Sequence, residues 1–112
     1  MIKTIHPRRI AREAVLQALY ASAMTGEDRA KILKDILNRR SYESNLIKYI
    51  TNLFNSAMDN KEWCENQIKS RLNNWEFERV ALLDRILLIV AISEIYFIEE
   101  VPPKVSISEA IE

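Results

Sequence analysis

The stretch "VALLDRILLIVAISEIYFI" at residues 80–98 decides between a membrane protein and a compact helical domain. It is the longest apolar stretch of the chain and is long enough to suggest a membrane span. Asp84, Arg85 and Glu94 interrupt it, and charged side chains are costly in lipid. We therefore predict a central core helix. Because the N-terminus also lacks the apolar segment of a secretory signal, we expect a cytoplasmic protein.

The composition fits one soluble all-α domain spanning residues 1–112. Hydrophobic residues make up 48% of the chain and charged residues 29%, which is an ordinary globular balance. The single glycine and three prolines leave few positions for the tight turns that join β-strands. A chain of 112 residues can still bury a real hydrophobic core.

Further helices are expected before the long apolar one. Pro7 marks the start of the first, because proline is favoured at the first helical position. Asp28 is a candidate N-cap for the second, and the segment "MDNKE" at 58–62 leaves open whether the third and fourth are separate or merely bent. The apolar positions at helical spacing are Ile10, Ala14, Leu16, Ala18 and Leu19; Ile32, Leu33, Ile36 and Leu37; Leu46, Ile47, Ile50, Leu53, Phe54, Ala57 and Met58; and Trp63, Cys64, Ile68 and Leu72.

The tail "EEVPPKVSISEAIE" at 99–112 predicts the start of one more helix. Pro102 and Pro103 end the preceding helix and favour an extended segment. Ser106 and Glu109 then stand at the spacing of a capping box, with Ser108 as an alternative cap. Only three residues follow Glu109, too few for a helix that persists in water. We therefore expect the final helix to be truncated.

Three arginines crowd the beginning of the first helix, in "HPRRIAREAVLQALY" at 6–20. Arg8, Arg9 and Arg12 fall near the positive pole of the helix dipole, where a cation costs about 0.3–1 kcal/mol. The net charge is zero, yet every charge before Glu13 is positive. Such segregation indicates a binding site for a polyanion on a solvated helix end. The alternative is an exposed helix end on which Arg9 pairs with Glu13.

Single-stranded RNA is the favoured polyanion. Gln17 and Tyr20 lie on the same helix and offer a hydrogen-bonding and a stacking group beside the arginines, although an aromatic residue at helical spacing is more often part of the core.

Asp84 and Arg85 raise a second question, because two adjacent charges in an apolar helix cannot both face a core without cost. Either they pair within the chain or a protein partner covers them.

Nothing in the sequence indicates catalysis, a metal or a cofactor. The only histidine is His6, the only cysteine is Cys64 and the only glycine is Gly26. These residues cannot supply a Cys–His pair, a histidine-based metal cluster or a glycine-rich phosphate loop. We expect Cys64 to be a small hydrophobic residue that is buried or half-buried. The prediction is a protein that is not an enzyme.

Three blocks of residues stand in order along the chain, namely "RRIAREAVLQALY" at 8–20, the pattern Asn74, Trp75, Arg79, Leu83, Asp84, Arg85, Leu88, Ala91 and Glu94, and "VPPKVSISEAIE" at 101–112. With these blocks the chain resembles the NusB family of transcription antitermination factors. The resemblance implies two packed three-helix bundles, the first over about 7–58 and the second over about 60–112. It also implies an arginine-rich helix that binds boxA RNA, and a ribosomal protein partner called Nus factor E.

The resemblance also implies roles for individual residues. Arg8, Arg9 and Arg12 match the RNA-binding motif, and Gln17 and Tyr20 match positions near the RNA. Asp84, with Arg85 beside it, matches the surface that faces the protein partner within the RNA polymerase antitermination complex.

The chain departs from the family pattern at three positions, with Ile89 in place of Arg, Ser93 in place of Tyr and Ser108 in place of Asn. Family members also continue beyond "SEAIE", so the second bundle is expected to be incomplete or completed by another copy in a homodimer. Two other functions stay open. One is the NusB-like module of a ribosomal RNA methyltransferase, and the other is a helical adaptor with no RNA role.

Overall fold

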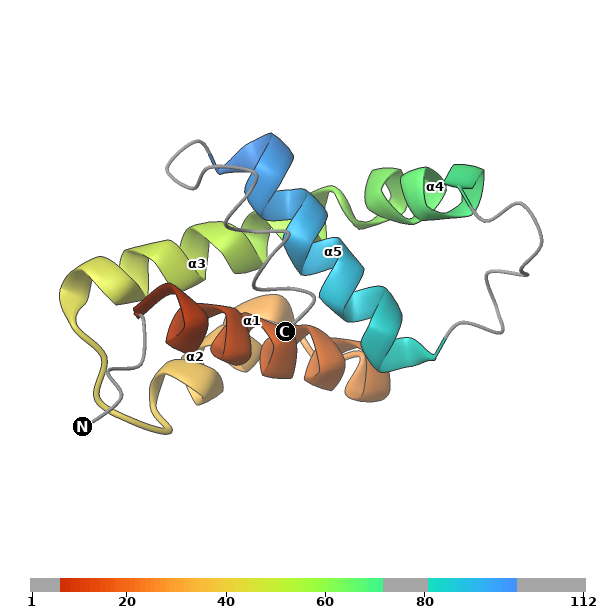
Figure 1. Cartoon of the computed structure of the whole chain (residues 1–112). Coiled ribbons are helices and arrows are strands. Elements are labelled where there is room, and N and C mark those ends of the chain that lie inside the picture. The colour runs from red at the N-terminus through yellow and green to blue at the C-terminus, as the bar shows by residue number, and fades with distance from the viewer. Residues whose placement is uncertain (1–6, 72–80, 99–112) are drawn as a thin grey trace, which may run out of the picture.

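A computed structural model describes residues 7–71 and 81–98 of the chain, and these residues form five α-helices without a strand. The predicted all-α class is therefore confirmed. Figure 1 shows α1, α2 and α3 lying together, with α5 running across α1 and α3. The helices are α1 (Pro7–Thr25), α2 (Arg29–Leu37), α3 (Ser44–Asp59), α4 (Lys61–Arg71) and α5 (Leu82–Phe97).

The core forms where α1 and α3 pack against each other. Three of the six buried residues of α1 are alanines, which allow a neighbouring helix to approach closely. Larger side chains of α3 fill the space, and Ile50, Leu53 and Phe54 are fully buried. Ile32 and Ile36 add the buried face of α2. As predicted, α1 begins at Pro7.

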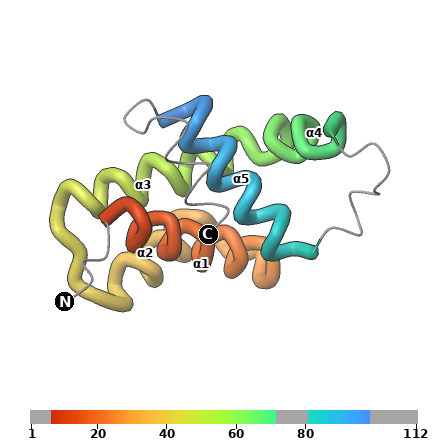
Figure 2. The backbone as a smooth tube through the Cα atoms, viewed as in Figure 1, coloured from red at the N-terminus to blue at the C-terminus, as the bar shows by residue number. Residues whose placement is uncertain are grey.

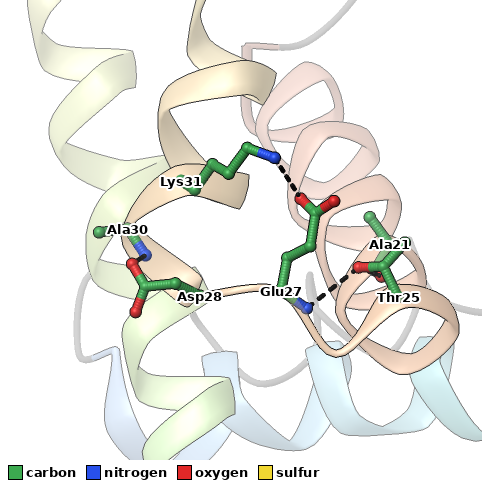
Figure 3. A network of polar contacts seen from close by, with 6 residues as sticks. All are labelled: Ala21, Thr25, Glu27, Asp28, Ala30 and Lys31. Carbon is green, nitrogen blue, oxygen red and sulfur yellow. Dashed lines mark hydrogen bonds and ion pairs between the residues drawn. The ribbon is translucent and has the colours of Figure 1, made fainter.

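The turn between α1 and α2 is fixed by local hydrogen bonds (Figure 3). Gly26 adopts a φ of 68°, a left-handed conformation that ends α1 at low cost because glycine has no Cβ. Asp28 accepts a hydrogen bond from the backbone N–H of Ala30 at 3.2 Å, which confirms it as the N-cap of α2. Glu27 forms an ion pair with Lys31 at 3.1 Å one turn further on.

A single residue separates α3 from α4, which answers the question left open at "MDNKE". The backbone N–H of Asn60 donates to the carbonyl of Ser56 at 3.0 Å, and its side-chain amide donates to the same oxygen at 2.8 Å. The first is the ordinary i→i−4 bond of the last turn of α3, and the second is a side-chain bond to the same carbonyl, so Asn60 ends the helix with both its donors used. The third and fourth helices are therefore separate, with a short break between them.

The long apolar segment is α5, a core helix as predicted. It crosses α1 and α3, and it also packs against α4 (Figure 2). Trp63 of α4 packs edge-on against Tyr96 and Phe97 of α5, with ring centroids 5.2 and 5.6 Å apart. Across residues 7–71 and 81–98, no helix has both the length and the apolar character to cross a membrane.

The helices α1, α2 and α3 pack together, and Asn60 separates α3 from α4. The division into two bundles stays a prediction, because parts of the second one lie outside the described residues. The same holds for the truncated final helix and for the positions His6, Asn74, Trp75, Arg79, Ser106, Ser108 and Glu109.

Candidate nucleic-acid interface

One face of α1 is exposed and carries three of the predicted RNA-binding residues. Arg9, Glu13, Gln17 and Tyr20 follow one another at intervals of three or four, so they share one side of the helix. All four are exposed, and Tyr20 retains 39% of its surface. Within the described part of the chain, Arg9 makes no salt bridge with Glu13. The structure thus brings Arg9, Gln17 and Tyr20 together on an open surface.

Arg12 departs from the expectation of three arginines on a solvated helix end, because only 9% of its surface is exposed. Its Nε donates to Glu94 Oε1 at 2.6 Å, and Glu94 is fully buried. The cause is tertiary packing: α5 crosses the buried side of α1 and places a carboxylate there. Arg12 therefore connects two core helices.

The second oxygen of the Glu94 carboxylate accepts a hydrogen bond from the phenol of Tyr49 on α3. Burial raises the pKa of Tyr49 far above its usual value of 10.0, and the hydrogen bond to Glu94 raises it further. The phenol therefore stays protonated and acts as a donor. Together Arg12, Tyr49 and Glu94 form a buried polar network that joins α1, α3 and α5.

Arg8 joins this network at its outer edge. Its guanidinium carbon lies 4.0 Å from the centroid of the Tyr49 ring, in a cation–π contact. Arg8 is half-buried, whereas Arg9 beside it is exposed. The arginines of one motif thus have three environments: Arg9 in solvent, Arg8 on an aromatic ring and Arg12 in the core.

A groove opens beside Arg8, between the start of α1 and the segment that leads into α3. Its volume is about 590 Å³. Three bases line it, namely Arg8, Arg40 and Lys48, against one acid, Glu43. The remaining lining residues are Pro7, Ile10, Ser41, Tyr42, Asn45, Leu46, Tyr49 and Asn52.

The basic residues of segment 38–44 are not among the RNA-binding residues predicted from the sequence. Arg39 donates to the side-chain oxygen of Gln17 at 3.4 Å, and the guanidinium of Arg40 lies 5.4 Å from the ring centroid of Tyr42. The signal was present in "NRRSYES", where two adjacent arginines precede an aromatic residue. Basic residues interleaved with aromatic ones are typical of nucleic-acid binding.

Asp84 and Arg85 lie near the start of α5, and they differ in environment. Asp84 is exposed in the first turn, where the helix dipole favours an acid. Leu83 and Leu88 flank it with 51% and 42% of their surfaces exposed. Arg85 is half-buried and lines a cavity of about 340 Å³ whose walls come from α1, α3, α4 and α5. Neither charge lies in the centre of the core.

The two departures on α5 are core residues. Ile89 retains 4% of its surface and Ser93 none, so both face the interior. The Ser93 hydroxyl lies 3.9 Å from the sulfur of Cys64, which is fully buried as predicted. Burial raises the pKa of the Cys64 thiol, which keeps it protonated. Among the described residues, no group of three His, Cys, Asp or Glu side chains could hold a metal ion.

Comparison with known proteins identifies one family. The NusB family model matches residues 9–112. The transcription antitermination protein NusB of Bacillus mycoides (strain KBAB4) is 38% identical over 105 residues, which cover 94% of this chain and 79% of that protein. Its counterpart in Bacillus cereus (strain ATCC 10987 / NRS 248) has the same identity and coverage.

Solved structures agree. T. maritima NusB superposes with a TM-score of 0.84 at 30% identity, over 98% of this chain and 76% of that one. A chain in the structure described as "Crystal Structure of a Plectonemic RNA Supercoil" has a TM-score of 0.85 at 19% identity, over 96% of this chain and 78% of that one. At that identity, the second likeness concerns the fold alone.

Proposed function

Because the chain belongs to the NusB family, we propose that it binds boxA-like single-stranded RNA together with a ribosomal protein, Nus factor E. In this role it joins the RNA polymerase antitermination complex and supports ribosomal RNA transcription, which would place it in the cytoplasm. The family assignment confirms the resemblance read from the sequence. The relatives are named for transcription antitermination, a non-enzymatic role, in agreement with the prediction that the chain is not an enzyme.

The observation that supports RNA binding is a cluster of arginine and lysine side chains around the N-terminal half of α1. Arg8 and Arg9 come from α1 itself, Arg39 and Arg40 from the segment between α2 and α3, and Lys48 from α3. Clustered basic side chains supply the attraction to phosphates that dominates nucleic-acid affinity. We propose phosphate contacts for Arg8 and Arg9 and a supporting role for Arg12, whose burial makes it part of the scaffold.

Two groups on the exposed face of α1 suit the RNA bases. Tyr20 offers a ring on which a base can stack, and the Gln17 amide can hydrogen-bond to a base edge. Arg39 donates to Gln17 and so limits the directions in which that amide can point. We propose that discrimination between RNA sequences comes from these groups and from the ribosomal partner rather than from the arginines.

The protein partner is proposed to bind at the start of α5. Asp84 offers a charge there, and the exposed Leu83 and Leu88 provide apolar surface on either side of it. A charged residue among exposed apolar side chains is typical of a protein interface. Arg85 contributes from its half-buried position one residue along the helix.

A binding titration separates this proposal from its alternatives. Fluorescence anisotropy measures the affinity for labelled boxA RNA and for a scrambled RNA of equal length, with and without the ribosomal protein. We expect tighter binding to boxA RNA and a further gain when the partner is present. Equal, weak binding to both RNAs would favour the helical adaptor. RNA binding that the ribosomal protein does not alter would favour the module of a methyltransferase.

A further inference from the structure

The groove beside Arg8 has a size and a lining that suit a small polar ligand. Its volume of about 590 Å³ lies within the range of about 300–1,000 Å³ found for ligand sites. The cavity between α4 and α5, of about 330 Å³, has a lining dominated by Ile68, Leu88, Ile92 and Ile95. The groove is instead lined by basic side chains, amides and phenols, so it favours a charged occupant that forms hydrogen bonds.

The charge of the groove favours an anion. Arg8, Arg40 and Lys48 outnumber the single carboxylate of Glu43. Among the described residues, neither Arg40 nor Lys48 forms a salt bridge. Lys48 is exposed on α3, and it shares one face of that helix with Asn45 and Asn52, which also line the groove. A phosphate in the groove would therefore meet cations contributed by two helices and a loop.

The same groove offers hydrogen-bonding and stacking groups for a base. The amides of Asn45 and Asn52 both donate and accept, as the edges of RNA bases require. Tyr42 is half-buried and lines the groove, with the guanidinium of Arg40 5.4 Å from its ring centroid. Aromatic rings and guanidinium planes are the surfaces on which unstacked RNA bases rest.

We infer that this groove is a nucleotide subsite, which holds one unstacked RNA nucleotide with its phosphate against Arg8 and Lys48 and its base against Tyr42. The inference rests on the proposed RNA-binding function and adds a specific place for one base outside the exposed face of α1. It assigns Tyr42, Arg40 and Lys48, none of which belongs to the arginine motif, to the binding of RNA.

The test compares variants of the full chain in anisotropy titrations against boxA RNA over a series of salt concentrations. Tyr42→Leu should weaken binding about 5- to 150-fold, the range found when a stacking ring is removed. Its salt slope should match wild type, and Tyr42→Phe should bind like wild type because stacking needs the ring alone. Tyr96→Leu is the matched control, because Tyr96 is exposed on α5, away from the groove.

Lys48→Gln should flatten the slope of log affinity against log salt by about 0.7, the contribution of one phosphate on a single strand. The matched control is Lys34→Gln, an exposed lysine of α2 outside the groove lining. Heparin, a polyanion without bases, serves as a second probe. Tyr42→Leu should leave heparin binding unchanged, whereas Lys48→Gln should weaken it.

Two results would overturn the inference while sparing the proposed function. In the first, wild type binds boxA RNA and Arg9→Gln weakens it, yet Tyr42→Leu and Lys48→Gln both bind like wild type. In the second, Tyr42→Leu weakens heparin and RNA equally, which would make the ring a structural support. Because Lys48 is exposed, Lys48→Gln decides the case even if Tyr42→Leu does not fold. A wild type that binds no RNA would refute both the function and the subsite.

Discussion

Replacing Arg12 should destabilise the fold far more than replacing Arg9, three residues away on the same helix. Arg12→Met keeps the apolar stem and removes the charge that faces Glu94, which is fully buried. Breaking a buried ion pair by removing one partner costs about 3–5 kcal/mol, because the other charge stays in the interior. Arg9 is exposed, so Arg9→Met should change the unfolding free energy by no more than about 0.5 kcal/mol.

A loss of this size is large for a small domain. Native domains are stable by about 5–15 kcal/mol, so Arg12→Met would remove a substantial share of that free energy. In a chain of this length, about 3 kcal/mol corresponds to a fall in Tm of at least about 10 °C. Urea unfolding followed by circular dichroism at 222 nm measures the difference between the Arg12 and Arg9 variants directly.

A double-mutant cycle shows whether the cost belongs to the pair. Glu94→Gln keeps an oxygen for the Tyr49 hydrogen bond and removes only the charge. Each single variant should be strongly destabilised, and the double variant should be more stable than the sum of the two losses predicts by about 3 kcal/mol. If the losses add, or if Arg12→Met unfolds at the same urea concentration as Arg9→Met, the buried network does not hold α1 to α5.

Three further outcomes follow from the described contacts. Burial raises the pKa of Tyr49, so the folded state holds the phenol proton more tightly than the unfolded chain does. The stability that this proton contributes is complete below pH 10 and declines as the pH rises above it. The urea midpoint should therefore fall between pH 8 and pH 11, and it should fall less in Tyr49→Phe than in wild type. Asp84→Lys should weaken the binding of the ribosomal partner, measured by calorimetry, by several kcal/mol and leave the affinity for RNA alone unchanged. The control Asp35→Lys, on the exposed surface of α2, should alter neither affinity. An unchanged partner affinity in Asp84→Lys would make Asp84 a purely structural residue. Asp28→Ala should lower the unfolding free energy by about 1 kcal/mol, because the N–H of Ala30 loses its acceptor; an unchanged thermal midpoint would contradict that capping role.

Local signals in the sequence predicted the helices well. Pro7 and Asp28 act through the backbone next to them, so their effects can be read without knowing the fold. The charges inside the apolar segment also predicted a core helix correctly. The sequence could not show which of those charges forms a buried ion pair. Only the crossing of α5 over α1 shows that Glu94 pairs with Arg12.

The groove could not be predicted for the same physical reason. Its walls come from α1, from the loop before α3 and from α3 itself, and no periodicity places Arg40 or Lys48 beside Arg8. Only the pair of arginines before Tyr42 hinted at a second basic site. Residues that act through neighbours in sequence were found, whereas those brought together by packing required the structure.

The salt dependence of RNA binding tests the central claim most directly. Affinity for boxA RNA is measured between about 50 and 200 mM salt for wild type and for the Arg8→Gln/Arg9→Gln variant. Each lost phosphate contact on a single strand flattens the slope of log affinity against log salt by about 0.7, so we expect the variant to be flatter by about 1.4. Affinity for scrambled RNA should fall in parallel, because these arginines contact phosphates. An unchanged slope in the folded variant would mean that neither arginine touches RNA, and would contradict the account.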